Sequence, residues 1–436
     1  MSRIKRLILL PIPIIWILFF LVGSLNLEFY LILIFLILSW LYFCFDYTNP
    51  YVLISPFAFI YNVSYYLVGD DYSIYYESYH SELFQLLFLY LNGFFFFTLI
   101  LYKKKKEIVF VNKSYDNEMR YISLIICILS WCLMAYYSIG FVLSGVQTKS
   151  QLVSLGFNSS ISVYISKLGL LSYLLFLYVS RANYKKIPNY LIYIPILAAL
   201  LYTLALGERS VLLSYVLIIL IYHYSIKAVS GVKLSVLSFI VISFIPILNG
   251  LKNVFTKNEI VFNEGGFVTK LLSGEFISSS KNVMFLLRDG FSDYFYGETL
   301  VWDFMRVFSL QGFGENMNAI SWYNKTYHSA YVDLGMGYGF SFLGEGFINF
   351  GYFGAVLWGG ILGGISTVLY NGIFIKRYMY ITYIFIVPVL IYAQRGDFSS
   401  ILSPIVKQVI IPVLIIHIVS VLIYKVTKGE KITYNM

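Results

Sequence analysis

Charged residues are scarce in this chain, and their scarcity indicates its class. Only 12% of the residues are Asp, Glu, Lys or Arg, whereas 59% are hydrophobic. A soluble domain usually has about 25% charged residues and has no interior large enough to bury so much apolar surface. The lipid bilayer is therefore the expected solvent for most of the chain.

Residue types that mark metal or cofactor chemistry are also few. The chain has 3 cysteines and 4 histidines, and all three cysteines lie inside apolar runs, where packing is their expected role. No His, Cys, Asp and Glu residues have the spacing of a metal site, and no Asp-x-Asp motif occurs. We expect no metal and no cofactor.

Long apolar runs predict an all-α, polytopic membrane protein. The runs are too long and too uniformly apolar for the alternating strands of a membrane barrel. About twelve of them approach the length of about 20 residues that a crossing helix needs. The predicted spans are 7–22, 29–45, 51–68, 83–102, 121–143, 161–179, 190–206, 211–225, 234–250, 352–371, 380–393 and 401–424.

Basic residues gather in alternate loops between these spans. The net charge of +9 therefore follows the positive-inside pattern, which argues against a nucleic-acid partner. The pattern predicts that both termini are cytoplasmic. No small-residue cleavage site follows the first apolar run, so we expect a retained helix and not a cleaved signal peptide.

One long polar interruption faces the other side of the membrane. We expect a single membrane domain over 1–436 that contains a large external loop at 251–340 and a glycine-rich re-entrant or interfacial segment at 335–351. Apolar stretches in the loop predict short helices at the membrane interface. The glycine segment lacks the strand-and-helix context of a nucleotide-binding loop. Further on, the pairs Gly359/Gly363 and Gly360/Gly364 predict close helix packing.

Four arginines on the external side suggest an anion site. Arg209 and Arg395 lie in tight turns, within Gly207-Glu208-Arg209-Ser210 and Gln394-Arg395-Gly396-Asp397, and Arg288 and Arg306 lie in the long loop. A guanidinium group presents a planar set of donors that suits phosphate, and a helix N-terminus favours anions. The alternative is that these arginines anchor lipid headgroups or pair with adjacent acids.

Two titratable residues near the arginines are candidates for acid–base chemistry. His328 is the one histidine among the loop arginines, and Glu345 lies between two glycines at the edge of a span, where a carboxyl is costly unless used or paired. A structural role is the alternative for each. The predicted substrate contacts are Glu208, Asp333, Tyr338, Ser341 and Tyr327. The dense loop aromatics suit sugar stacking as well as interfacial anchoring.

The chain resembles the O-antigen polymerase (Wzy) family of oligosaccharide repeat-unit polymerases. Its aromatic-rich hydrophobic architecture resembles that family over nearly the whole length. The more specific features are the Gly207-Glu208-Arg209-Ser210 turn and the segment Gly337-x-Gly339-x-Ser341-Phe342-x-Gly344-Glu345-x-x-x-Asn349-Phe350-Gly351-x-x-Gly354. The Arg-x10-Gly pattern of some members is absent and assigns no residues here.

The resemblance implies a GT-C-like glycosyltransferase in the bacterial inner membrane with its active site facing the periplasm. A glycan on undecaprenyl pyrophosphate would be transferred to a second lipid-linked repeat unit, with arginines binding the pyrophosphate and Glu345 or His328 activating the acceptor. A chain-length regulator and a flippase are the partners it implies, beside membrane lipids. An O-antigen ligase using the same donor is the nearest alternative. A flippase or other transporter predicts inverted repeats and mid-membrane charges, which the chain lacks.

Overall fold

A computed structural model describes most of the chain. The described residues are 9–21, 23–68, 77–103, 107–108, 110–143, 159–182, 190–206, 209–238, 240, 267–272, 275–308, 318–333 and 338–428. Within them every regular element is helical, which confirms the all-α prediction. The chain divides into two compact units, and each is described by itself.

Seven helices of the described residues are long and apolar enough to cross a membrane, which confirms the membrane class. They span Leu25–Tyr42, Pro50–Val68, Tyr79–Leu101, Asp116–Leu143, Ile161–Ala182, Phe342–Gly372 and Ser399–Lys428. Three shorter apolar helices accompany them, at Pro11–Leu21, Tyr193–Leu206 and Arg209–Ser225. Most of the predicted span 234–250 lies outside the described residues.

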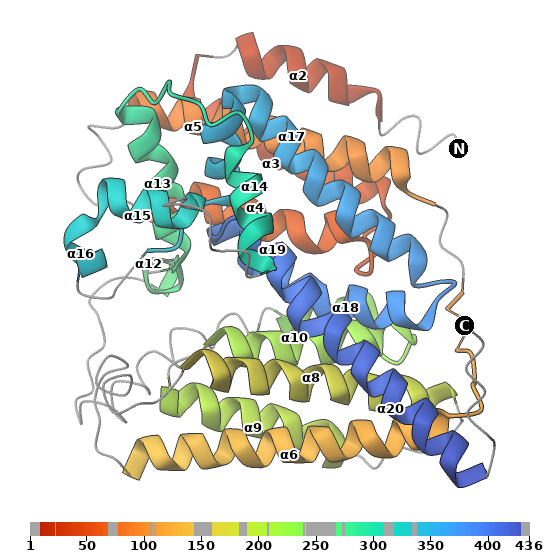
Figure 1. Cartoon of the computed structure of the whole chain (residues 1–436). Helices are drawn as coiled ribbons and strands as arrows, with labels where there is room; N and C mark the ends of the chain where they lie inside the picture. Colours follow the sequence, from red (N-terminus) through yellow and green to blue (C-terminus); the bar gives the residue numbers. More distant parts are fainter. Residues whose placement is uncertain are drawn as a thin grey trace. The chain divides into compact units, whose positions relative to one another are not determined.

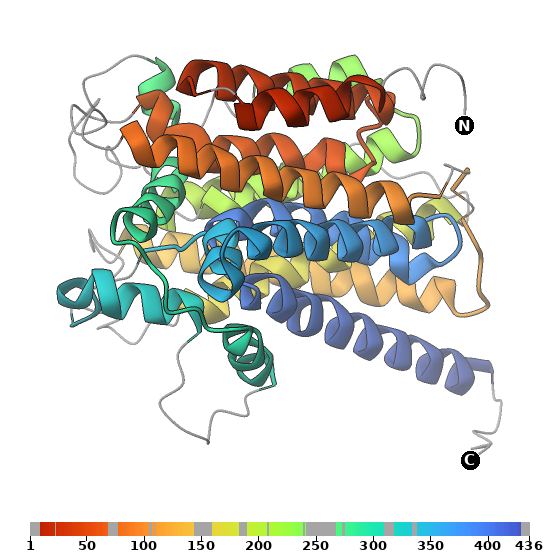
Figure 2. The ribbon, with the colours of Figure 1, turned by 90° about the horizontal axis from the view of Figure 1, so that it is seen from above.

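Unit 1 comprises residues 1–105, 266–371 and 389–403. Four apolar helices form its first part: α2 (Pro11–Leu21), α3 (Leu25–Tyr42), α4 (Pro50–Val68) and α5 (Glu77–Leu101). Figure 2 shows α2, α3 and α5 lying side by side. The predicted external loop contributes α12 (Phe267–Leu272), α13 (Glu275–Arg288), α14 (Glu298–Val307), α15 (Ala319–Tyr327) and α16 (Ser329–Asp333). Most of α17 (Phe342–Gly372), the end of α18, η2 (Ala393–Arg395) and α19 (Ser399–Ser403) complete the unit.

Helices α5 and α17 approach each other at small residues, as the glycine spacing predicts. A Cβ on Gly359 would overlap the carbonyl oxygen of Tyr90, and one on Gly93 would overlap that of Val356. A Cβ on Gly363 would lie 2.7 Å from the carbonyl oxygen of Phe94. Such backbone proximity gives van der Waals attraction where lipid offers no hydrophobic driving force.

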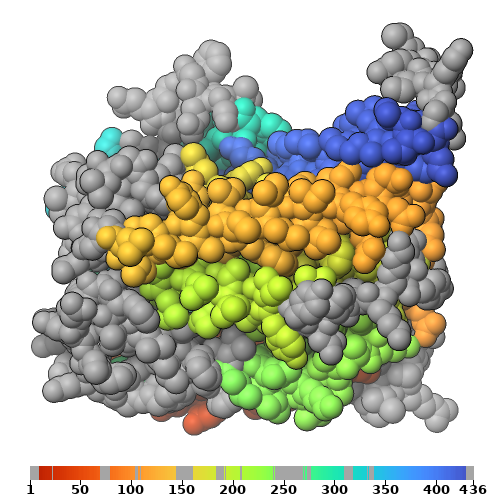
Figure 3. All heavy atoms as spheres, turned by 90° about the horizontal axis from the view of Figure 1, so that it is seen from below, coloured from red at the N-terminus to blue at the C-terminus, as the bar shows by residue number. Residues whose placement is uncertain are grey.

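Unit 2 comprises residues 106–265, 372–388 and 404–436. Its helices are α6 (Asp116–Leu143), α8 (Ser159–Ala182), α9 (Tyr190–Leu206), α10 (Arg209–Ser225), the first part of α18 (Arg377–Tyr392), the π-helical η3 (Pro404–Ile410) and α20 (Ile411–Lys428). Helices α6, α8, α9 and α10 lie side by side (Figure 1). Apolar side chains of α6, such as Ile125, Leu129 and Leu143, are exposed, as expected for contact with lipid. Figure 3 shows the outer surface of α6.

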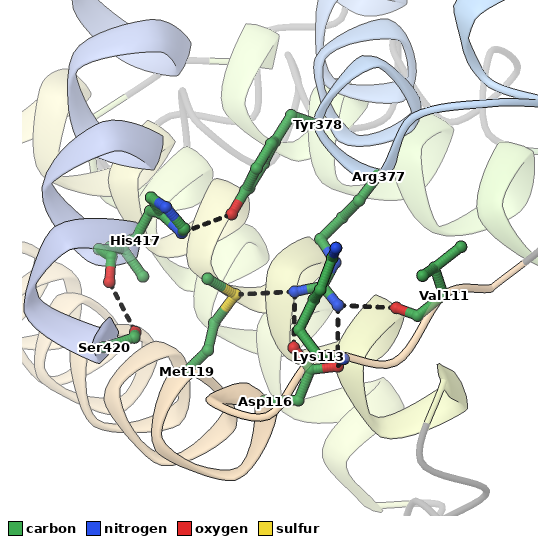
Figure 4. Close-up of polar contacts among 9 residues, drawn as sticks. Val111, Lys113, Asp116, Met119, Arg377, Tyr378, His417 and Ser420 are labelled. Carbon is green, nitrogen blue, oxygen red and sulfur yellow. Dashed lines mark hydrogen bonds and ion pairs between the residues drawn. The ribbon is translucent and has the colours of Figure 1, made fainter. Parts of the chain in front are cut away.

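A buried ion pair fixes the start of α18 in unit 2. Arg377 donates to both carboxylate oxygens of Asp116, at 2.6 and 2.8 Å, and also to the carbonyl oxygen of Val111 (Figure 4). Its guanidinium group lies over the ring of Tyr178, and next along α18 Tyr378 shares a hydrogen bond with His417. The side chains of the pair are only 6% and 2% exposed, so neither charge is solvated by bulk water.

Replacing Arg377 by Ala should destabilise unit 2 strongly, because Asp116 would remain buried without its cation. We expect a loss of about 3–5 kcal/mol in unfolding free energy, measured by denaturation of the purified protein in detergent. The control is Lys227→Ala, since the Lys227–Glu107 pair is exposed and should contribute little. Equal stability of the two variants would contradict a structural role for Arg377.

Candidate functional site

The site in unit 1 is organised by a break within α17. Phe350 and Gly351 leave helical geometry, and Gly351 has a φ of 59°, which favours glycine. The two helical segments cross where Gly346 meets Gly354: a Cβ on Gly354 would overlap the carbonyl oxygen of Gly346. A Cβ on Gly346 would lie 2.7 Å from the carbonyl oxygen of Gly354. Two glycines therefore permit the crossing that brings the segments together.

The freed backbone at this break is hydrogen-bonded to the chain that enters α14. The N–H groups of Phe295 and Tyr296 donate to the carbonyl oxygens of Ile348 and Asn349, at 3.0 and 3.1 Å. The Asn349 side chain accepts from Gly297 N and donates to Thr299 Oγ1. The break is therefore a junction that holds α14 against α17.

Glu345 lies at the centre of this junction and is fully buried. Its Oε1 accepts from Thr299 Oγ1 at 3.0 Å, and its Oε2 accepts from Trp358 Nε1 at 3.2 Å and from Phe398 N at 2.7 Å. Both oxygens are thus occupied by donors of the chain itself. Ser341, also buried, begins the same helix, because its hydroxyl accepts from Gly344 N at 3.2 Å.

The turn after α18 carries Arg395 to the backbone of the glycine-rich segment. A Cβ on Gly339 would lie 2.6 Å from the carbonyl oxygen of Arg395 and 3.0 Å from its Nε. Glycine is thus required at 339 for the arginine to approach. The guanidinium group also lies over the ring of Tyr392, 5.2 Å from its centre. The arginine turn and the glycine-rich segment therefore lie in contact.

Helices α13 and α15 hold the segment that receives Arg395. Asn324 on α15 accepts from Tyr338 N at 2.7 Å and donates to Tyr338 O at 2.8 Å. Asn282 on α13 donates to the carbonyl oxygen of Gly339 and accepts from Tyr323 Oη at 2.9 Å. Two asparagines therefore fix the segment through its backbone, which leaves the Tyr338 ring exposed.

His328 stacks on this exposed tyrosine. Their ring centres are 4.4 Å apart with the planes tilted by 44°, and the Tyr323 ring also contacts the histidine, edge-on at 5.5 Å. Burial lowers the pKa of His328, and the positive charge of Lys281 lowers it further. The lowered pKa favours the neutral imidazole at pH 7, the form that a general base requires. The side chain is half-buried, and its Nε2 atom is buried.

Lys281 and Arg288 flank one aromatic ring on the exposed face of α13. The Lys281 Nζ and the Arg288 Cζ lie 5.5 and 4.8 Å from the centre of the Phe285 ring. Arg288 also pairs with its neighbour Asp289 at 2.7 Å. The Tyr327 ring stacks on Phe285, and burial followed by the Asp289 charge raises the Tyr327 pKa to about 12. This face combines cations with aromatic rings, the surface expected for a phosphorylated sugar.

The structure gathers some predicted residues and separates others. Arg395, His328 and Tyr338 share the surface built by α13, α15 and residues 338–341, and Arg288 and Tyr327 continue it. Arg306 is exposed on the last turn of α14. Arg209 begins α10 in unit 2, and Glu208 and the side chain of Asp333 lie outside the described residues.

The positions of several residues of this site were not predicted from the sequence. Lys281 and Asn282 lie among ordinary polar residues, and only the helical spacing from Lys281 to Phe285 and Arg288 hints at a shared face. Asp303 was not singled out, and Asp397 was considered only as an acid that could pair with Arg395, yet both are fully buried. Among the described residues, no group of three or more His, Cys, Asp or Glu is arranged to hold a metal ion.

The fold and the site together define a class: a helical membrane protein in which the helices between its apolar segments carry a cationic, aromatic surface. Comparison with protein families makes the class specific. The model of the O-antigen polysaccharide polymerase Wzy family matches residues 4–427. The chain therefore belongs to the O-antigen polysaccharide polymerase Wzy family, which confirms the resemblance seen in the sequence. None of the curated proteins or solved structures compared with the chain matches it.

Replacing Gly354 by Ala should prevent the two segments of α17 from crossing, because the new Cβ would overlap the Gly346 carbonyl oxygen. We expect loss of folded protein in the membrane, measured by fluorescence-detected size exclusion. Gly364→Ala is the matched control on the same helix, since its nearest neighbour would be a Leu101 methyl group at 4.0 Å. Normal folding of Gly354→Ala would show that the crossing is dispensable.

Proposed function

We propose that this chain polymerises oligosaccharide repeat units carried on undecaprenyl pyrophosphate at the periplasmic face of the bacterial inner membrane. The observation that carries the proposal is the surface of unit 1 on which Arg288, Arg395 and Lys281 surround aromatic rings beside a neutral His328. Membership of the Wzy family supports the substrate class. A GT-C-like arrangement of about twelve spans with both termini cytoplasmic belongs to this proposal.

The reaction needs charge stabilisation at the leaving group and removal of one proton. The acceptor hydroxyl oxygen attacks the anomeric carbon of the donor glycan, the bond from that carbon to the pyrophosphate breaks, and undecaprenyl pyrophosphate leaves. Arg395 and Arg288, with Arg306 and Arg209 as further ligands, would bind the pyrophosphate oxygens. Their guanidinium groups provide the positive charge, so the proposed step uses no metal ion or other cofactor.

His328 is a better candidate for the base than Glu345. Both Glu345 oxygens accept hydrogen bonds within a fully buried junction, whereas the His328 side chain is only half-buried and lies on the surface that also carries Arg395. We assign the acceptor proton to His328 and a positioning role to Glu345. Tyr338 and Tyr327 would stack on sugar rings, Ser341 would hold the segment through the α17 cap, and Glu208 and Asp333 remain proposed substrate contacts.

The direct test uses the purified protein, a lipid-linked repeat unit and a chelator, without any nucleotide sugar. A ladder of longer lipid-linked glycans is the expected product. In cells, deletion should leave a single repeat unit on lipid A–core. Loss of all attached O-antigen would instead indicate a ligase, and loss of external lipid-linked repeat units would indicate a flippase. Addition of a chain-length regulator should change the modal length of the ladder.

Arginine variants test the pyrophosphate site. Removal of one preorganised donor to a developing charge typically lowers kcat by about 10²–10³-fold. We expect losses of this order in Arg395→Ala and Arg288→Ala, and a smaller loss in exposed Arg306→Ala. Arg181→Ala, at the exposed end of α8, is the control. Normal ladders from Arg288→Ala and Arg306→Ala at normal expression would exclude them from the site.

The pH profile tests His328. Since the pKa of His328 is lowered from its usual 6.5, activity should persist into mildly acidic solution and fall only below that value. Lys281→Met removes a cause of the lowering, so the acidic limb should move to higher pH. Lys325→Met, an exposed lysine on α15, should leave the limb in place. A limb that survives in His328→Gln would belong to another group.

A further inference from the structure

Three buried carboxyl groups converge below Arg395. They are Asp303 on α14, Glu345 on α17 and Asp397 in the turn, and all three are fully buried. Each accepts a successive backbone N–H at the start of α19: Phe398 N donates to Glu345 at 2.7 Å, Ser399 N to Asp303 at 2.9 Å and Ser400 N to Asp397 at 3.1 Å. Helices α14 and α19 lie against each other (Figure 1). Three negative charges in one dry cluster would repel strongly.

Both carboxyl oxygens of Asp397 are surrounded by hydrogen-bond donors. Its Oδ1 accepts from Ser399 Oγ at 2.7 Å and from Ser400 Oγ at 2.9 Å, besides Ser400 N. Its Oδ2 accepts from Asn318 Nδ2 at 2.6 Å. A carboxylate can accept all four bonds, whereas a carboxylic acid would turn one O–H toward a donor.

Asp303 has the opposite surroundings. Only Ser399 N donates to its Oδ2, and its Oδ1 is buried and accepts no hydrogen bond from any described donor. The charges that act on it are those of Asp397 and Glu345, both negative. Burial, followed by these two charges, raises the pKa of Asp303 far above its ordinary range. The remaining charged groups of α14, Glu298 and Arg306, are exposed on its first and last turns.

We propose that Asp303 is a neutral carboxylic acid whose O–H donates a hydrogen bond to Glu345, and that this pair positions Arg395. With Asp303 protonated, the three carboxyl groups hold the turn before α19 while carrying two negative charges and not three. This inference rests on the proposed function, because Arg395 is assigned there to the pyrophosphate. Asp303 touches neither substrate nor leaving group, so it is a positioning residue.

The turn transmits the state of this pair to Arg395. The side-chain oxygen of Gln394 accepts a hydrogen bond from Tyr90 Oη at 3.0 Å. Its backbone carbonyl oxygen accepts one from Ser279 Oγ at 3.1 Å. Gly396 N donates to Ala393 O at 2.8 Å, which closes the turn between these anchors and the carboxyl cluster. Ionisation of Asp303 would repel the cluster from the turn and move Arg395 away from Gly339.

The experiment compares Asp303→Asn with Asp397→Asn over a range of pH. An amide at 303 imitates the protonated acid, since its NH2 can donate to Glu345 while its oxygen accepts from Ser399 N. We expect it to support polymerisation at neutral pH and to extend activity to more alkaline solution than wild type. An amide at 397 presents N–H groups to donors, so kcat should fall by about tenfold or more while the KM changes little. Glu298→Gln, exposed on α14, is the charge control and should keep the wild-type profile.

Unfolding measured without substrate separates this inference from the proposed function. Between the unfolded and folded pKa values of Asp303, the folded protein holds one more proton. The folding equilibrium of wild type should therefore weaken by about tenfold per pH unit as pH rises. Asp303→Asn should lose this dependence, and Glu298→Gln should retain it.

Two results would overturn the acid pair: equal alkaline loss of stability in wild type and Asp303→Asn, or equal loss of activity in the two amide variants. If wild type forms no ladder but the stability pattern holds, the polymerase assignment fails and the acid pair stands. If wild type forms ladders but Asp303→Asn keeps the alkaline loss, the acid pair fails alone.

Discussion

The crossing of Gly346 and Gly354 is the contact on which the unit 1 site depends. Without it α17 would continue as one straight helix, and Glu345 in its first segment would not meet Trp358 in its second. The same break frees the carbonyl groups that bind the chain before α14. A single close approach of two backbones thus places a buried acid, a short helix and the turn of Arg395 around one point. A methyl group at either glycine would separate them.

Three acids of this unit are buried, whereas three of its basic residues lie on the surface. The acids Asp303, Glu345 and Asp397 lie inside, where backbone N–H groups and side-chain donors satisfy them. Lys281, Arg288 and Arg306 lie on the outside. This arrangement follows from the solvent available to each group: a lysine or arginine keeps its head in water, whereas a short carboxyl can be buried only where donors are already fixed.

The sequence allowed prediction of the spans because apolar runs of about 20 residues have one stable environment. The span before α18 was predicted as 352–371, whereas the helix runs over Phe342–Gly372, because glycines 344, 346 and 351 read as loop. His328, Tyr338 and Arg395 were predicted and lie together. Asp303 was missed, and the burial of Asp397 was not foreseen, since an acid in a polar stretch looks the same whether water or another helix faces it. Only tertiary contacts decide whether such a side chain is buried. The same holds for Lys281, whose proximity to His328 depends on the packing of α13 against α15.

A protonated Asp303 also resolves an electrostatic conflict in the site. Three carboxylates beneath the site would offset the positive charge of Arg395, which is two residues from Asp397 in the sequence. In a low-dielectric setting they would also repel the pyrophosphate group of the proposed substrate. Removal of one charge by protonation leaves the arginine field directed toward the external surface. The donor groups at the start of α19 offset much of the remaining two. The buried acids can therefore hold the turn firmly without cancelling the positive charge that the turn presents.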